Sequence, residues 1–311
     1  MSRLVIVTGA HGFIGRHACR ALATQGFVVR GIGHGQWTQE EARSWGISRW
    51  LASDLDFDSL TAIAAEEHPI AVIHCAGSGS VSYAYDAPFE DFRRSVMTVA
   101  TLLEFVRRRC SGKPRVVITS SAAVYGDQGD VDLAESSTCS PISPYGFNKH
   151  AAEDLCRSYA RFFGLEITIV RLFSVYGEGL RKQLLWDGAN KMIRGDGQFF
   201  GTGHELRDWI HVDDAASLLC ASAFQPQAKL EIFNGANTQA TTSHVLGLLN
   251  TLLAGRLPPR FTGETHTGNP RRLTADSSHV RRQLNWAPSI DLESGLRRYA
   301  DWFKKVENRT P

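Results

Sequence analysis

A tyrosine and a lysine stand four residues apart in the middle of the chain, at Tyr145 and Lys149. On a helix this spacing places both side chains on one face, one turn apart. A nearby ammonium favours the phenolate and should lower the pKa of the tyrosine from its ordinary value of about 10. A tyrosine of this kind can take a proton from a sugar hydroxyl while a hydride leaves the same carbon. A Tyr-x-x-x-Lys pair also occurs on ordinary surface helices, so a third residue is needed to predict a catalytic site.

The third residue is a serine at the end of an expected strand. Ser120 and Ser121 follow a run of strand-forming residues at 115–119. In open α/β folds, ligands bind at the carboxyl ends of the parallel strands. A serine hydroxyl at that edge can hydrogen-bond the oxygen of the reacting carbon. Ser121, Tyr145 and Lys149 are therefore the predicted catalytic residues.

Three glycines follow the first apolar run, 4–8, at Gly9, Gly12 and Gly15. Gly9 permits a tight turn, Gly12 lets the backbone approach a diphosphate, and Gly15 lets the following helix pack closely on the strand. The start of that helix offers backbone N–H groups and the positive end of its dipole to phosphates. A glycine pattern between a strand and a helix predicts a dinucleotide-binding loop.

The acidic residue that usually reads the adenosine ribose is absent. It would stand at the end of the second strand, about 20 residues further on, where this chain has Gly33 and His34. Without a carboxylate there is neither an acceptor for the 2′-hydroxyl nor repulsion against a 2′-phosphate. The cofactor is therefore NAD or NADP, and this position leans toward NADP unless NAD is held mainly by other contacts.

Short apolar runs alternate with segments of helical length over the first half of the chain. The runs are 4–8, 28–32, 71–75, 115–119 and 166–171, and the helical segments include 13–25, 88–109 and 143–163. This alternation predicts an α/β fold with a Rossmann-type, doubly wound parallel sheet. After residue 176 the elements become shorter. We expect a cofactor-binding domain at 1–176 and a smaller C-terminal α/β substrate lobe at 177–311, part of which returns to the main sheet.

Composition narrows the classes of partner. The chain has 34 Lys and Arg against 32 Asp and Glu, a formal net charge of +2, which disfavours nucleic-acid binding. No run approaches the ~20 apolar residues of a spanning helix, and the first residues lack the pattern of a secretory signal. The six cysteines form no C-x-x-C pair and the histidines show no metal spacing. We expect a cytoplasmic protein with no metal and no membrane partner.

Several motifs, in order along nearly the whole chain, give it a family resemblance. They are 8–15 (TGAHGFIG), 74–77 (HCAG), 120–126 (SSAAVYG), 145–149 (YGFNK), 171–177 (RLFSVYG) and 207–214 (RDWIHVDD). This series resembles the extended short-chain dehydrogenase/reductases that modify nucleotide sugars, the epimerase/dehydratase family that includes UDP-glucose 4-epimerase.

The resemblance implies a role for each matching residue. Tyr145 would be the acid/base, Lys149 would tune it and bind the nicotinamide ribose, and Ser121 would orient the sugar C4 oxygen. The implied cofactor contacts are Gly9, Gly12, Phe13, Ile14, Gly15, His34, Asp54, Leu55, Ala76, Gly77, Tyr145, Lys149 and Phe173. The implied substrate contacts are Ser80, Ser121, Ser174, Arg207 and Arg271, with the guanidinium of Arg207 on the diphosphate of the nucleotide sugar.

Departures from the family pattern limit the reaction. The 4,6-dehydratases carry an Asp-Glu pair where this chain has Ala122 and Ala123, so dehydration is not expected. Ser174 and Ser95 each replace a frequent asparagine. The family's late Arg-Pro-Gly-Asp stretch appears at 266–270 as HTGNP, so Arg271 or Arg272 is expected to supply the missing charge.

Two reactions at the sugar C4 remain, together with one non-enzymatic alternative. Family frequency favours a nucleotide-sugar 4-epimerase, whereas the residue at Gly33 favours an NADPH-dependent reductase of a 4-keto-6-deoxy sugar. A dinucleotide sensor would be expected to have lost the tyrosine, lysine or serine. We expect the 4-epimerase.

The segment 88–109 carries an apolar stripe at helical spacing, formed by Phe92, Val96, Val99, Leu103 and Val106. We expect this stripe to pack on the sheet. By resemblance, a helix of this type also contributes to a homodimer through a four-helix interface.

Overall fold

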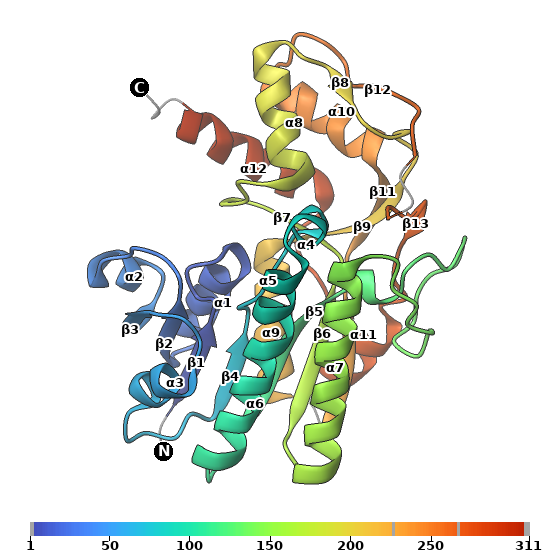
Figure 1. Ribbon diagram of the computed structural model, residues 1–311. Coiled ribbons are helices and arrows are strands. Elements are labelled where there is room, and N and C mark those ends of the chain that lie inside the picture. Colours follow the sequence, from blue (N-terminus) through green and yellow to red (C-terminus); the bar gives the residue numbers. More distant parts are fainter. Residues whose placement is uncertain (1–2, 226–227, 266–267, 308–311) are drawn as a thin grey trace.

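The computed structural model describes residues 3–225, 228–265 and 268–307, and its largest feature is a parallel sheet of seven strands (Figure 1). The strands are β1 (Leu4–Thr8), β2 (Val28–Gly33), β3 (Ile47–Ala52), β4 (Ala71–His74), β5 (Arg115–Ser121), β6 (Ile167–Leu172) and β10 (Leu230–Gly235). Their order across the sheet is β10-β6-β5-β4-β1-β2-β3. The order reverses direction at β1 and β4, which is where doubly wound sheets bind their ligands. The predicted fold class is confirmed.

Helices cover both faces of this sheet (Figure 1). One face is packed by α1 (Phe13–Thr24) and α9 (Val212–Phe224), and the other by α3 (Phe57–Ala64), α6 (Thr98–Arg109) and α7 (Pro144–Phe163). Because both faces are covered, every residue of β1, β4 and β6 is buried. The catalytic edge of the sheet is thus held by a core on each side.

The expected single helix at 88–109 is less regular than its periodicity suggests. It consists of α5 (Pro88–Phe92), a π-helical segment (Arg93–Met97) and α6. Val96, Val99, Leu103 and Val106 are buried as expected, but Phe92 is exposed. The prediction for Phe92 is wrong, and the π-helical turn that follows it shifts the register of the stripe.

A smaller lobe sits over the carboxyl edge of the main sheet (Figure 1). It contains β7 (Ser174–Tyr176), β9 (Leu206–His211), β11 (Thr238–Thr241) and β13 (Arg272–Leu273) in one sheet, and β8 (Gln198–Phe199) paired with β12 (Arg260–Phe261). The helices α8 (Gln183–Arg194), α10 (Thr242–Leu253) and α12 (Leu292–Glu307) pack around a second core. The chain leaves this lobe to form α9 and β10 of the main sheet, and again to form α11 (Ser278–Leu284) against β10.

Partly buried charges join the two lobes. His17 of α1 lies 2.6 Å from a carboxylate oxygen of Asp213, and Arg298 of α12 donates to that carboxylate at 2.5 Å and to Glu178 at 2.8 Å. His211 lies 2.9 Å from the other oxygen of Glu178. This network fixes the segment after β7 against the start of α1.

Among the described residues, no helix is long and apolar enough to cross a membrane.

Candidate functional site

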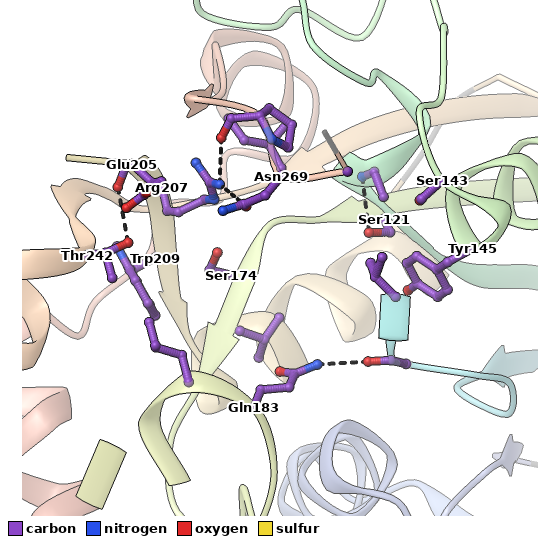
Figure 2. A pocket seen from close by; sticks show the side chains of 18 of the residues that line it. Ser121, Ser143, Tyr145, Ser174, Gln183, Glu205, Arg207, Trp209, Thr242 and Asn269 are labelled. Atoms are coloured by element: carbon purple, nitrogen blue, oxygen red, sulfur yellow. Dashed lines mark hydrogen bonds between the residues drawn. The ribbon is translucent and has the colours of Figure 1, made fainter. Parts of the chain in front are cut away.

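The end of β5 and the start of α7 bring the predicted catalytic residues together. Ser143 caps α7 by accepting a hydrogen bond from the backbone N–H of Gly146, at 3.1 Å. A Cβ on Gly146 would lie only 2.5 Å from the carbonyl oxygen of Ala123, so the glycine lets α7 rest directly on the turn after β5. The side chains of Ser121 and Tyr145 consequently lie side by side in the same cavity (Figure 2).

Burial controls the charge state of this pair. Burial raises the pKa of Tyr145 to about 12, and a hydrogen bond with the side chain of Ser121 opposes the rise. Lys149 is also buried; its Nζ donates to the carbonyl oxygen of Thr119 at 3.1 Å and lies 5.8 Å from the centre of the Tyr145 ring. The expected lowering of the tyrosine pKa is therefore not seen in the protein without cofactor, because burial dominates the shift and the Lys149 ammonium is not among its causes.

A groove of about 830 Å³ runs along the carboxyl ends of β1, β2 and β4. Seven of the predicted cofactor contacts line it: Gly9, Gly12, His34, Asp54, Leu55, Ala76 and Gly77. Gly9 has a φ of +66°, and a Cβ there would lie 2.5 Å from the backbone nitrogen of Ala76. The groove is thus a cradle that a side chain at Gly9 would fill, at the edge of the sheet where dinucleotides bind.

The first turn of α1 closes one end of the groove. A Cβ on Gly15 would lie 2.2 Å from the carbonyl oxygen of Gly9, so only glycine allows this approach. No side chain caps the helix at Gly12, which leaves the N–H groups at Phe13 and Ile14 as the natural partners of a diphosphate. The ring of Phe13 packs against the core of the smaller lobe.

At the end of β2, Gly33 and His34 occupy the place of the acidic residue that usually binds the adenosine ribose. Gly33 has a φ of +153°, and its Cβ would come within 3.3 Å of Gly9. His34 instead contacts the carboxylate of Asp54. Arg30 donates to the carbonyl oxygens of Ile63 and Ala64, so its guanidinium is already engaged away from the groove.

A second cavity, of about 450 Å³, lies between the catalytic edge and the smaller lobe (Figure 2). Ser121, Ser174 and Arg207 line it, as predicted for substrate contacts. The guanidinium of Arg207 donates to the carbonyl oxygens of Leu206 and Pro270, at 2.8 and 2.6 Å, and is also bonded to the side chain of Asn269. These contacts hold a half-buried cation at the end of the cavity opposite Tyr145 (Figure 2).

Besides Phe13, Ile14, Gly15 and Lys149, described above, three more predicted contacts line neither the groove nor the cavity. Arg271 is exposed and pairs with Asp130, and its side chain does not line the cavity. Ser80 caps α4 (Val81–Asp86) by accepting from the N–H of Tyr83 at 3.3 Å, and its neighbours Gly79 and Val81 line the cavity instead. Phe173 is buried against Tyr125, outside the linings of both the groove and the cavity.

Other cavity residues were not predicted. They include Ile142, Leu180, Gln183, Phe200, Glu205, Trp209, Thr242 and Asn269. Gln183 has a φ of +64° and donates to the carbonyl oxygen of Gly79 at 2.7 Å, a strained conformation of the kind found at functional sites. Nothing in the sequence distinguishes Gln183 from the polar residues around it. Asn269 had a signal, because it stands in the late stretch where the chain departs from the family pattern. Positions 266 and 267 of that stretch lie outside the described residues.

Within the described ranges, no group of three or more His, Cys, Asp or Glu side chains could hold a metal ion.

Known proteins match this arrangement over the whole chain. The family model "NAD dependent epimerase/dehydratase family" matches residues 5–235. The chain is 27% identical to a UDP-glucuronate 4-epimerase of Thermodesulfobacterium geofontis, covering 96% of each chain. It is 28% identical to a UDP-glucose 4-epimerase of Azospirillum brasilense, covering 97% of this chain and 92% of the relative.

Solved structures agree with the sequence matches. A UDP-glucose 4-epimerase of Thermotoga maritima with UDP-glucose superposes with a TM-score of 0.88 at 25% identity, covering 98% of this chain and 99% of that one. MoeE5 in complex with UDP-glucuronic acid and NAD superposes with a TM-score of 0.86 at 26% identity, covering 97% and 99%. With its glycine loop, its Ser-Tyr-Lys edge and the family match over most of its length, the chain belongs to the NAD-dependent epimerase/dehydratase family.

Proposed function

We propose that this enzyme is an NAD-dependent nucleotide-sugar 4-epimerase. The observation that carries the proposal is the placement of Ser121 and Tyr145 in a cavity that adjoins the dinucleotide groove. Gly77 lines the groove and Gly79, two residues on, lines the cavity. A sugar in the cavity and a nicotinamide in the groove would therefore meet beside Tyr145.

The residues divide the chemistry between them. Ser121 hydrogen-bonds the C4 oxygen, and Tyr145 removes its proton and later returns it. When bound, NAD⁺ would supply the acceptor for the C4 hydride, its reduced form would supply the hydride for the other face, and its positive charge would favour the phenolate. Lys149 adds its own positive charge from behind the tyrosine. Arg207 holds the distal diphosphate, leaving the 4-keto ring free to turn.

The cavity walls also bear on the reaction. Ala123 lines the cavity where a dehydratase would need an acid or base, so the site lacks the groups for removal of water across C5 and C6. Arg30 is bound to the end of α3 and is unavailable to a 2′-phosphate, which favours NAD over NADP. The relatives named above act as 4-epimerases of UDP-sugars, and we propose a UDP-hexose or UDP-hexuronate as the substrate.

Two measurements test the function. Purified protein is denatured and the released NAD(H) and NADP(H) are counted per chain; a recycling epimerase should carry NAD(H) near one per chain. UDP-glucose and UDP-glucuronate are then incubated with the enzyme without added cofactor, and the C4 epimers are separated and quantified. Protein that is purified empty, prefers NADPH and reduces a 4-keto-6-deoxy sugar would identify the reductase instead.

We further propose that the enzyme is a homodimer through α6 and α7. The outer face of α7 carries Phe147 and Phe162, whose exposed fractions are 61% and 70%. Large aromatic side chains exposed on one helix face are typical of an interface. The double variant Phe147→Asp with Phe162→Asp should elute as a monomer in size-exclusion chromatography with light scattering, while the wild type elutes at twice the mass of one chain. A monomeric wild type would contradict the dimer.

We propose separate tasks for the two lobes: the main-sheet lobe, built mostly from residues 1–176, holds the cofactor, and the smaller lobe, built mostly from residues 177–311, holds the nucleotide sugar. We place the enzyme in the cytoplasm, because all six of its cysteines are unpaired.

A further inference from the structure

A carboxylate is buried behind the catalytic lysine with one oxygen unbonded. Asp91 of α5 has no exposed surface. Its Oδ2 accepts a hydrogen bond from Nδ2 of Asn148 at 2.6 Å, whereas Oδ1 has no hydrogen-bond partner among the described residues. Ser95 stands four residues further on, is also buried, and its Oγ is likewise unbonded within the described part of the chain. Buried charges are normally paired, so this carboxylate calls for an explanation.

The two arginines that follow Asp91 on the same helical stretch already form ion pairs with another carboxylate. Arg93 and Arg94 both bind the carboxylate of Glu90, at 2.8 and 2.7 Å. Across the described residues, no lysine, arginine or histidine nitrogen lies within the 4.0 Å of an ion pair with Asp91. Asp91 therefore has no direct counter-ion on its own element.

Lys149 is the buried cation on the helix that faces Asp91. It directly follows Asn148, the residue that binds Asp91. A Cβ on Gly77 would lie 3.6 Å from Nζ of Lys149 and 3.5 Å from the carbonyl oxygen of Arg94. The ammonium and the helical stretch that carries Asp91 thus flank the same glycine.

The other ionisable groups around Lys149 cannot serve as its counter-ion. Glu153 is bound by Arg171 at 2.7 Å and by Arg157 at 3.0 Å. Burial lowers the pKa of His74 to about 3, so it is neutral, and burial raises the pKa of the Cys75 thiol to about 12, so it is also neutral. Asp91 is left as the carboxylate near Lys149 that has no cation of its own.

We propose that Asp91 is a positioning residue that acts through Lys149, as the buried counter-ion that keeps the ammonium charged beside Tyr145. Asp91 reaches neither substrate nor cofactor in this role. Burial lowers the pKa of Lys149, and Asp91 is the foremost of the charges that oppose this lowering. The same carboxylate contributes to the raised pKa of Tyr145. The inference rests on the proposed function only where turnover is the readout.

The test is Asp91→Asn, which keeps the size of the side chain and an oxygen that can accept from Asn148. Removing the negative charge should lower the pKa of both Lys149 and Tyr145. Both limbs of the pH–kcat profile should therefore move to lower pH, by about one pH unit. The matched control is Asp154→Asn, which removes an exposed carboxylate from α7 and should move neither limb. A fall in kcat with both limbs unmoved would show a merely structural role and overturn the proposal.

A second readout needs no turnover. Lysine side chains are labelled with ¹³C at Cε, the Lys149 signal is assigned with Lys149→Arg, and its titration is followed by NMR in wild type and Asp91→Asn. A lower pKa of Lys149 in the variant supports the counter-ion even if no nucleotide sugar is turned over, which would count against the proposed function alone. Identical titrations would overturn the counter-ion. Asp91→Ser, which also removes the charge, replaces Asp91→Asn if the latter does not fold.

Discussion

The dinucleotide groove and the sugar cavity come close to each other at Gly77 and Gly79 but are built in different ways. The groove is shaped by backbone: Gly9, Gly15 and Gly33 approach one another so closely that a Cβ on any of them would meet main-chain atoms. The cavity is shaped by side chains that come from the main sheet, α7, the segment after β7, and β9 to β13. A groove of this kind depends on which residues lack side chains, and a cavity of this kind depends on which side chains the tertiary fold happens to gather.

Tyr145→Phe is expected to have the largest effect that is confined to one of the two regions, the cavity. Loss of the phenolic hydroxyl removes the acid/base and should lower kcat by about 10²- to 10⁴-fold, while the groove still binds cofactor. Tyr159→Phe is the matched control, because Tyr159 lies on the same helix and bonds Glu104, away from the cavity. Epimerase assays and cofactor counts per chain measure both effects. Turnover above one tenth of wild type in Tyr145→Phe would contradict the assigned role.

Gly15→Ala should damage the groove alone. The new Cβ would lie 2.2 Å from the carbonyl oxygen of Gly9, and such overpacking costs about 1–3 kcal/mol or more. We expect less bound NAD(H) per purified chain and a lower thermal midpoint. Gly247→Ala is the control: it lies inside α10, its Cβ would meet nothing within 4 Å, and alanine favours a helix. Equal cofactor content in Gly15→Ala and wild type would show that the loop tolerates a side chain.

Arg207→Ala should damage the cavity alone. A hydrogen bond to a charged group contributes about 1.5–3 kcal/mol, so KM for the nucleotide sugar should rise by roughly 10- to 100-fold, with cofactor content unchanged. Arg271→Ala tests the alternative cation, and its exposed pairing with Asp130 predicts less than about a twofold change. If Arg271→Ala raised KM more than Arg207→Ala, the placement of the diphosphate would have to be reversed.

The smallest effect concerns how the groove influences the cavity. Burial raises the pKa of Tyr145 to about 12 in the protein without cofactor, so the phenol stays neutral throughout the physiological pH range. Positive charge from bound NAD⁺ should lower that pKa. The tyrosinate absorbance near 295 nm, taken as the difference between wild type and Tyr145→Phe, should rise at lower pH once NAD⁺ is added. An unchanged titration would mean that the cofactor's charge does not reach Tyr145.

The contrast between a groove formed by a local glycine pattern and a cavity formed by tertiary packing also explains which residues could be predicted from the sequence. The glycine loop and the pair Tyr145 and Lys149 are local patterns, so their spacing alone placed them on the correct elements. β3 was not predicted because it is an edge strand with exposed Ser48 and Arg49, which interrupt its apolar pattern. Arg271 and Ser80 were predicted from the family resemblance, but the Arg271 side chain pairs with Asp130 and the Ser80 hydroxyl caps α4.

The pKa shifts of the site residues were the other property that could not be predicted from the sequence. The four-residue spacing of Tyr145 and Lys149 correctly predicts a shared region, but the sign of the pKa shift depends on burial, which only the packed structure gives. Asp91 shows the same limit, since an acidic residue that directly follows Glu90 in the sequence gives no indication that it is fully buried against α7.

The return of α9 and β10 from the smaller lobe to the main sheet has a consequence for how such an enzyme can change. A chain cut after residue 176 would lack the strand that pairs with β6 from Ile167 to Leu172, and an open strand edge invites aggregation. The segment that forms the sugar-binding lobe therefore cannot be replaced as a unit, because the same segment also contributes β10 to the main sheet. New sugar specificities would have to be reached by single substitutions around the cavity, in evolution as in engineering, and not by grafting one lobe onto another.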